Sequence, residues 1–433
     1  MSGSIDGLGM TVEELTDAWV YLFGRFLVIR QEHVDLAEDG AAYNAIKHNP
    51  PVLSGAEAGV APTFVNPNLD VVYSEAWIGV DAETPALLVV PEVPAGTYST
   101  AQIVDEWAEI TYNINPRTMP DHPHGTFALC LAGSGPVIPD GAVRLDLPSA
   151  KAKLLARVQM GADADAAVAL QHGFSVRSCG SPRIEPAVPA PAFTNTAPPA
   201  AAMFAQPALD QALAPPDRSG HGDAFRPRLD RIAAFVAADP ANAQRIDELV
   251  RTSVYPAFMK LLLTDLAEVG RGWRTTGNRS GFSADYRFRT VANFAGIWWN
   301  SASEVIYYAL QADETGHPPT GDHTYAIRFG PGQSPGEHVD GYWSMTLYSH
   351  PDVRLVPNPI GVYSIGYRTE LVHDADGGFT VHIAAKQPDG TPQSNWLPST
   401  PPGEPWSIVL RLYLPRDDVL AGEWSPPAMT IEA

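Results

Sequence analysis

The chain has 433 residues, which is enough for two or three domains with substantial apolar cores. It carries 28 Lys and Arg against 49 Asp and Glu, and a formal net charge of −21 has the wrong sign for a protein that binds nucleic acid or an anionic membrane surface. Hydrophobic residues make up 45% of the chain and only 2 residues are cysteines, so a largely disordered chain and a disulfide scaffold are both excluded.

The sequence shows neither an export signal at its N-terminus nor a long uninterrupted apolar run. We therefore expect a cytoplasmic protein whose partners include neither nucleic acid nor a membrane. Cys130 and Cys179 are too few for a disulfide framework, and they are more typical of small buried side chains than of a redox site.

The first predicted element is a helix within an N-terminal helical segment, residues 1–50. Thr11 and Glu14 have the spacing of a capping box, and apolar residues then recur at helical spacing up to about Gln31: Leu15, Trp19, Leu22, Phe26 and Ile29. Residues 51–180 instead contain short β-rich pieces bounded by Pro and Gly, which predicts an N-terminal β-rich domain.

The middle of the chain is predicted to be a linker followed by helices. Residues 181–222 are dominated by Ala and Pro, which is typical of a linker or a surface excursion. Helical spacing returns in residues 223–315, where Pro256 should kink a helix and a further helix should run from about Asn293 to Leu310.

Residues 316–433 predict a C-terminal β-sandwich-like domain. Three segments alternate cleanly between two kinds of side chain: Tyr342 to Tyr348, Phe379 to Ile383, and Trp406 to Leu414. One face of the last segment is entirely apolar, so we expect it to pack against a second layer. The second face of the first segment mixes rings and hydroxyls, which fits either a ligand cleft or a solvent-facing β-surface.

Familiar catalytic and cofactor signatures are missing from the sequence, including G-x-S-x-G, H-E-x-x-H, a Walker loop and G-x-G-x-x-G. We therefore expect no organic cofactor. The best local metal candidate is Asp121, His122 and His124, but these residues lie between Pro120 and Gly125, where turn residues gather without binding metal. No metal ligand is assigned.

Two carboxylates flank an aromatic ring in the strand predicted from Thr97. Asp105, Trp107 and Glu109 would alternate onto one face of that strand. Acid pairs beside a ring suit carbohydrate chemistry, and their spacing permits it without being diagnostic. A polar strand face in contact with water has the same pattern.

A series of ordered motifs covers roughly residues 50–160 and 290–433: Asn66 to Trp77, Ile103 to Trp107, Tyr342 to Tyr348, Val356 to Ile360, Tyr363 to Thr369, Asn395 to Pro398, and Leu410 to Tyr413. In these motifs the sequence resembles a two-domain bacterial family of unknown function, the domain-of-unknown-function pair 1254 (N-terminal) and 1214 (C-terminal). The resemblance implies an α+β fold with β-sandwich or jelly-roll-like layers in both halves and accompanying helical segments, in agreement with the alternating strands.

Two positions depart from the pattern of that family. Relatives often carry Arg where this chain has Leu69, and often carry Asp where it has Tyr367. If those two residues form a salt bridge in relatives, both partners are missing here together. The change fits either a repacked structural contact or a less charged pocket for a more apolar ligand.

The leading functional hypothesis is a small-molecule enzyme of the hydrolase or lyase type, which works by acid–base chemistry in a cleft between the two β-rich halves. The expected catalytic residues are Asp70, Tyr73 and Asp105, and the expected substrate-binding residues are Asn68, Trp107, Tyr348, Asn358, Arg368 and Trp396. The Asn66 to Tyr73 segment is also compatible with ordinary turn chemistry.

The alternative is a non-catalytic module that binds glycans or hydrophobic metabolites. An enzyme should bury one of its acids beside an enclosed pocket, whereas a binding module should present open aromatic platforms. In either case the expected partner is a small molecule, and the sequence leaves self-association into a homo-oligomer open.

Overall fold

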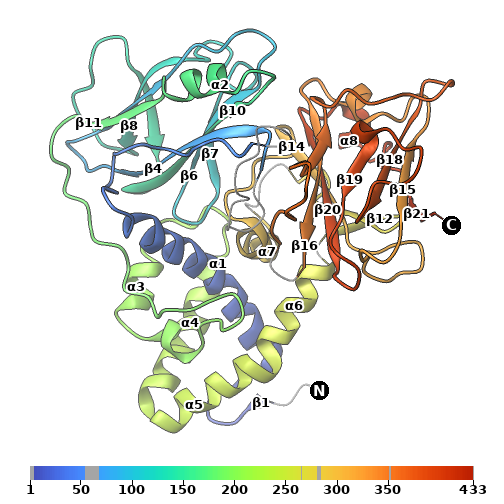
Figure 1. Cartoon of the computed structure of the whole chain (residues 1–433). Coiled ribbons are helices and arrows are strands. Elements are labelled where there is room, and N and C mark those ends of the chain that lie inside the picture. Colours follow the sequence, from blue (N-terminus) through green and yellow to red (C-terminus); the bar gives the residue numbers. More distant parts are fainter. Residues whose placement is uncertain (1–3, 54–67, 265, 280–283, 351–352, 433) are drawn as a thin grey trace.

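The computed structural model describes residues 4–53, 68–264, 266–279, 284–350 and 353–432. Figure 1 shows two strand-rich halves side by side, with a block of helices next to them. The predicted α+β class with β-sandwich layers in both halves is confirmed. Asn66 of the first family motif lies outside the described residues.

The N-terminal half packs a five-stranded sheet against a four-stranded sheet. The first has the order β3 (Lys47–His48), β4 (Val71–Gly79), β10 (Lys151–Gln159), β6 (Ser99–Val104), β7 (Ile110–Ile114). The second has the order β11 (Ser175–Ser178), β5 (Ala86–Val90), β8 (Gly125–Leu131), β9 (Val143–Leu147). Side chains from both sheets share one core, and a short helix, α2 (Ala164–Gln171), packs against β10 and β4.

The C-terminal half is a second sandwich. Its larger sheet has the order β12 (Ala267–Gly270), β13 (Trp273–Thr275), β14 (Val305–Leu310), β20 (Trp406–Tyr413), β16 (Trp343–Ser349), β17 (Ser364–Gly366). Its smaller sheet has the order β19 (Trp396–Pro398), β18 (Phe379–Ala384), β15 (Tyr325–Phe329), β21 (Met429–Ile431). The apolar face of β20 lies in the core between the two sheets, as its alternation predicts.

The long helix α1 (Val12–Leu36) begins with the predicted capping box, in which the Thr11 hydroxyl accepts from the Glu14 N–H and the Glu14 carboxylate accepts from the Thr11 N–H. The helix continues beyond Gln31, where the apolar pattern stops, because Glu32 and Asp35 form ion pairs with lysines of β10. Just before it, the short strands β1 (Ser4–Ile5) and β2 (Met10–Thr11) pair.

Further helices surround α1: α3 (Ala208–Ala212), α4 (Gly222–Ala238), α5 (Pro240–Leu249), α6 (Tyr255–Thr264) and α7 (Tyr286–Gly296). A π-helical turn at Val250–Val254 stands directly before the predicted kink at Pro256. Gly24 of α1 lies against α7, where the Thr290 hydroxyl donates to the Val20 carbonyl at 2.9 Å. Short helical turns complete the described part: Ala201–Phe204, Pro335–His338, Gln393–Asn395 and α8 (Asp417–Leu420).

Two predictions for the middle of the chain are wrong in part. The helix expected from Asn293 to Leu310 ends at Gly296, and Val305–Leu310 is the central strand β14. Its aromatic and β-branched residues alternate between two buried surroundings, which overrides the apparent helical spacing. The helical segment 223–315 therefore also contains β12, β13 and β14 of the C-terminal sandwich.

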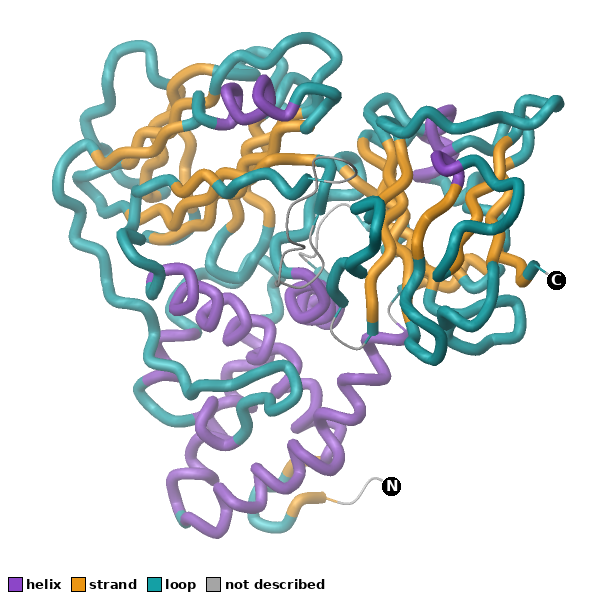
Figure 2. The backbone as a smooth tube through the Cα atoms, viewed as in Figure 1, coloured by secondary structure: helices purple, strands orange, loops and turns teal. Residues whose placement is uncertain are grey.

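The segment 181–222 is more than a linker. Its second part contributes buried side chains to the core of the helical block, namely Ala201, Met203, Phe204, Leu209 and Ala212. Figure 2 shows this loop-rich segment descending from the N-terminal half to the helices. None of the helices in the described part of the chain is long and apolar enough to cross a membrane.

Candidate functional site

The joint between the two halves is formed by the start of β4 and the second face of β16 and β20. Asn68 shapes the turn before β4, because its side-chain oxygen accepts from the Asp70 N–H at 2.9 Å. The Asn68 amide nitrogen donates to the Tyr413 hydroxyl of β20 at 2.7 Å and to the Tyr73 hydroxyl at 3.2 Å. The turn expected from the sequence is present, and it also binds the opposite half.

Asp70 is the acid that faces the C-terminal half. Its carboxylate accepts a short hydrogen bond from the Ser344 hydroxyl of β16, and its side chain is 2% exposed. Burial raises the pKa of Asp70, while Arg411, the Ser344 hydrogen bond and Arg368 act in the opposite direction. The carboxyl group is therefore held in a protonation equilibrium shifted toward the neutral form.

A cavity of about 270 Å³ opens at Asp70. It is lined by Asp70, Ser344, Val362, Ser364, Ile365, Gly366, Tyr367, Arg368, Thr369, Gln393 and Ser394. Asp70 and Ser344 are almost completely buried and form its inner end, whereas Arg368 and Gln393 are exposed at its mouth. Arg368 is fixed by donating to the Leu69 carbonyl at 2.7 Å.

Tyr348 and Arg411 lie on the same sheet face behind Asp70. Arg411 donates to the Tyr348 hydroxyl at 2.8 Å and to the Thr346 hydroxyl at 3.2 Å. Arg411 was not among the predicted site residues, although the alternation of β20 places it, as the one charged residue of that strand, on the face opposite the core. That alternation in the sequence could have identified Arg411 as a candidate site residue.

Arg157 of β10 is a second buried guanidinium at the joint. It donates to the Gln102 side-chain oxygen at 2.7 Å and to the Trp298 carbonyl at 2.9 Å, and it lies 5.7 Å from the centre of the Tyr73 ring. Arg157 was not among the predicted site residues either. The alternation of side chains along β10 could have indicated it, because Lys151, Lys153 and Arg157 are spaced to share one face of that strand.

The structure corrects the prediction for Asp105 and Trp107. Residues 105–109 form a turn between β6 and β7, with Ala108 at a φ of 64°, and not a continuous strand face. Asp105 accepts from the backbone N–H groups of Trp107 and Glu109 and from Arg218, each at 2.9 Å. Burial raises its pKa, but its oxygens are occupied within this turn.

Trp107 is 1% exposed and its indole donates to the Pro215 carbonyl at 3.1 Å. The Arg289 guanidinium carbon lies 4.8 Å from the centre of the Trp107 ring, and Arg289 forms an ion pair with Glu109 at 3.2 Å. The turn therefore docks the N-terminal half onto the helical block instead of presenting a ring to solvent.

Asn358 and Trp396 do not line the Asp70 cavity in the described part of the chain. The Asn358 amide donates to the carbonyls of Val356 and Val362, so it shapes the loop that brings Val362 to the cavity wall. The Trp396 indole donates to the Ala384 carbonyl inside the smaller sheet. Among the predicted site residues, the joint thus gathers Asn68, Asp70, Tyr73, Tyr348 and Arg368.

The two positions that depart from the family pattern lie in different apolar clusters. Leu69 is buried with Tyr348 and other side chains, whereas Tyr367 packs against Tyr342, at a distance of 4.6 Å between ring centres. The Tyr367 hydroxyl accepts from the Gly161 N–H at 3.1 Å. Both positions therefore make apolar contacts across the joint, and Arg368 is a polar link between their two segments.

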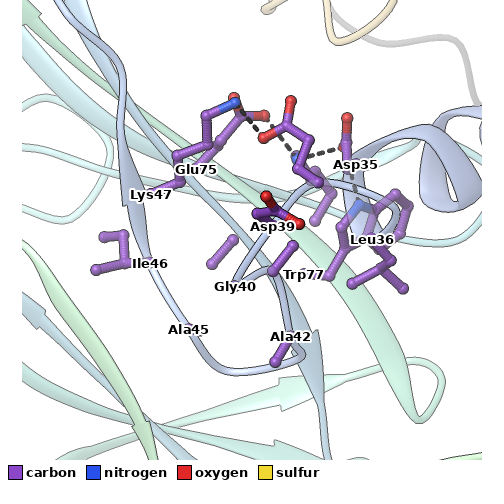
Figure 3. A pocket seen from close by; sticks show the side chains of 14 residues that line it. Asp35, Leu36, Asp39, Gly40, Ala42, Ala45, Ile46, Lys47, Glu75 and Trp77 are labelled. Carbon is purple, nitrogen blue, oxygen red and sulfur yellow. Dashed lines mark hydrogen bonds and ion pairs between the residues drawn. The ribbon is translucent and has the colours of Figure 1, made fainter.

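A second hollow, of about 250 Å³, lies where α1 ends beside β4, and Figure 3 shows the side chains that surround it. Lys153 is 1% exposed there and pairs with Asp35 and Glu75, each at 2.7 Å. The Trp77 indole also donates to Asp35, at 2.9 Å. Because its buried polar groups bind one another, we regard this hollow as part of the scaffold.

In the described residues, no group of three or more His, Cys, Asp and Glu side chains is arranged to hold an ion. Asp121, His122 and His124 lie in the loop between β7 and β8, where they are exposed. This loop matches the turn interpretation of the sequence.

Two family models match the sequence: DUF1254, a protein of unknown function, over residues 43–178, and DUF1214, also a protein of unknown function, over residues 304–417. Among solved structures, the chain is similar to the VPA0106 protein of Vibrio parahaemolyticus, with 18% identity, a TM-score of 0.65, and coverage of 98% of this chain and 100% of that chain. A putative uncharacterized protein from Burkholderia cenocepacia gives 12% identity and a TM-score of 0.41, with 96% and 88% coverage. No curated protein matches the sequence.

Proposed function

The chain belongs to the two-domain family that pairs DUF1254 with DUF1214, and from that premise we propose that the joint of the two domains is an active site. The proposed protein is a small-molecule enzyme of the hydrolase or lyase type, which works by acid–base chemistry without an organic cofactor. Asp70 is its proton-transferring group, and the cavity at Asp70 holds its substrate.

One observation carries this proposal: a carboxyl group that is 2% exposed and has a raised pKa lies at the inner end of a cavity. A raised pKa brings a carboxyl group closer to the pH at which proton transfer is efficient. Burying such a group costs stability, so its position beside an opening favours a chemical role over a structural one.

The neighbouring groups fit the handling of a small polar molecule. Ser344 donates to Asp70 and so fixes the carboxyl group relative to the cavity. Thr369 and Arg368 supply hydroxyl and guanidinium donors along the wall toward the mouth, whereas the Ser364 hydroxyl donates to the Met345 carbonyl. In the proposal Asp70 moves the proton, while these donors orient the substrate.

The alternative, a non-catalytic module for glycans or hydrophobic metabolites, would need exposed rings. Trp107, Tyr348 and Trp396 are 1%, 0% and 7% exposed, and each makes a hydrogen bond inside the protein. This burial supports the enzyme over the binding module.

The test is a metabolite library screened by thermal shift on the full chain, followed by NMR detection of turnover for each ligand that binds. We expect Asp70→Asn to bind the same ligand and to convert it about 10²–10⁴-fold more slowly. Asp105→Asn is the matched control, since it changes a buried aspartate with a raised pKa at another turn, and it should keep activity.

If the wild-type protein binds ligands and leaves them all unchanged, the binding module replaces the enzyme. Equal turnover by Asp70→Asn and the wild type would remove Asp70 from the mechanism. The cytoplasmic location and the homo-oligomer stay predictions, which cell fractionation and light scattering of the purified chain would test.

A further inference from the structure

The joint contains tyrosine hydroxyl groups whose protons have no acceptor. The Asn68 amide donates to the oxygens of Tyr73 and Tyr413, so the O–H of each phenol is left to donate elsewhere. In the described part of the chain neither O–H has an acceptor, and the Tyr307 hydroxyl of β14 makes no hydrogen bond there either. The O–H groups of these three tyrosines therefore have no acceptor among the described residues.

Arg157 adds a positive charge to the same place. Its side chain is in the buried class at 7% exposed, and its partners are the neutral Gln102 side chain, the Trp298 carbonyl and the Tyr73 ring. No carboxylate among the described residues forms an ion pair with it. A guanidinium taken out of water is costly unless an anion accompanies it.

Arg157 and the phenols also belong to one electrostatic neighbourhood. Tyr73, Tyr307 and Tyr413 pack in one cluster of side chains, and the Arg157 guanidinium lies 5.7 Å from the centre of the Tyr73 ring. Burial raises the pKa of Tyr307, and Arg157 opposes that rise. Solvent reaches part of this group of residues, because Tyr73, Tyr307 and Asn68 are only half-buried.

The acids at the joint are already engaged. Asp70 accepts from Ser344, and Glu304 accepts from both Arg117 and Asn115. The place therefore has a surplus of donors over acceptors. Phenolic hydroxyls without an acceptor beside a guanidinium without a carboxylate match the chemistry of an oxyanion, which has acceptors only.

We propose that Arg157 and the hydroxyls of Tyr73, Tyr307 and Tyr413 form an oxyanion site for a carboxylate or a phosphate group. This inference deepens the proposed function and rests on it for one point, that the bound anion is the substrate. The substrate of the enzyme is then a small organic anion. Asn68, which contacts Tyr73, Tyr413 and the Asp70 N–H, connects the oxyanion site to the proton-transferring acid.

The experiment is titration calorimetry of the full chain with pyruvate, lactate and benzoate, each beside its uncharged primary amide, and with inorganic phosphate. We expect at least one carboxylate to bind 10-fold or more tightly than its amide, or phosphate to bind measurably. The two arms identify which oxyanion the site takes. If every carboxylate binds no better than its amide and phosphate does not bind, the proposal is overturned.

The variants test whether Arg157 is responsible. Arg157→Gln should weaken anion binding about 10-fold or more, whereas Arg157→Lys should keep the preference for the anion because it keeps the charge. Arg144→Gln is the control, since it removes a half-buried arginine of the N-terminal half that is already paired with a carboxylate, Asp146. Unchanged anion affinity in a folded Arg157→Gln protein would overturn the proposal.

Tyr307→Phe removes a single hydroxyl and serves if the Arg157 variants do not fold. We expect a loss of about 3- to 10-fold in anion affinity, and no loss would count against the site. The failures of the two proposals are distinguishable. Anion binding without any turnover keeps the oxyanion site and removes the enzyme, and Asp70-dependent turnover of the uncharged amides alone does the reverse.

Discussion

The two ends of strand β10 present cations from one strand face to different surroundings. Toward its start, Lys151 pairs with Glu32 at 2.9 Å, and Lys153 pairs with Asp35 and Glu75 at 2.7 Å. Toward its end, Arg157 is bound by an amide oxygen, a backbone carbonyl and a ring. The first end holds α1 against the sheet, and the second end faces the joint.

This contrast separates two uses of a buried charge. A cation matched by carboxylates closes a network and fixes two elements relative to each other. A buried cation that is surrounded by neutral groups has no counter-ion within the protein, and it can still attract an anion from solution. The pairing state of each cation on β10 therefore indicates whether its surroundings are scaffold or site.

The largest effect is expected when the scaffold end is broken. Burial alone would raise the pKa of Glu75, yet Lys153 holds it below its ordinary value. Lys153→Met leaves Asp35 and Glu75 facing each other, and we expect a loss of about 3 kcal/mol in the free energy of unfolding. Urea unfolding at pH 7 measures it.

Lys47→Met is the matched control at the rim of the same hollow. Lys47 and Glu38 form a pair whose side chains are 49% and 46% exposed, so its loss should cost less than about 1 kcal/mol. Because the pKa of Glu75 is lowered in the folded protein, the stability that Lys153 supplies should fade as the pH falls toward acid. Equal effects of the two substitutions at pH 7 would contradict the scaffold role.

A smaller effect of opposite sign is expected at the joint. The pKa of Asp70 is raised by burial, so the folded protein binds this proton more tightly than the unfolded chain does, and stability falls as the pH rises from the unfolded pKa through the folded one. Asp70→Asn removes that fall and should stabilise the protein by about 1 kcal/mol at pH 7, with no gain at pH 4. Thermal unfolding at both pH values checks the prediction, and destabilisation at pH 7 would make Asp70 a structural residue.

The smallest effect concerns two tyrosine hydroxyls inside the joint. The hydroxyls of Tyr98 and Tyr342 are buried and have no partner in the described part of the chain. Tyr98→Phe and Tyr342→Phe should each change stability by less than about 0.5 kcal/mol, because no hydrogen bond is lost. Tyr413→Phe is the comparison, since it removes the nearer of the two acceptors of the Asn68 amide and should cost about 1 kcal/mol.

Local patterns in the sequence were sufficient for much of the fold. The alternation of Trp406 to Leu414 and the capping box at Thr11 each depend on neighbouring residues, and both are present. The strand β14 was missed because Trp298, Trp299 and Ile306 imitate helical spacing. Only the pairing of β14 with β13 and β20 reveals its role, and that pairing joins residues far apart in the chain.

The candidate site was predictable where one segment carries it. Asn68, Asp70 and Tyr73 come from a single motif, and Asp70 does lie at a cavity. Ser344, Arg157 and Arg411 were missed because each lies at the site only through the packing of the two halves. The sequence does not show which surfaces of the two sheets lie opposite each other. Asp105 was misplaced because a turn at Ala108 ends the strand alternation on which its role depended.

The close contact of Gly24 with Thr290 has a consequence for how this protein can be divided. A methyl group at position 24 would lie 2.4 Å from the Thr290 hydroxyl oxygen, so the first helix and the helix preceding β14 fit together only without a side chain between them. The family matches, 43–178 and 304–417, exclude both helices and the strands β12, β13 and β21. A gene fragment limited to either match would therefore encode a sandwich without the helices and strands that pack against it in this structure.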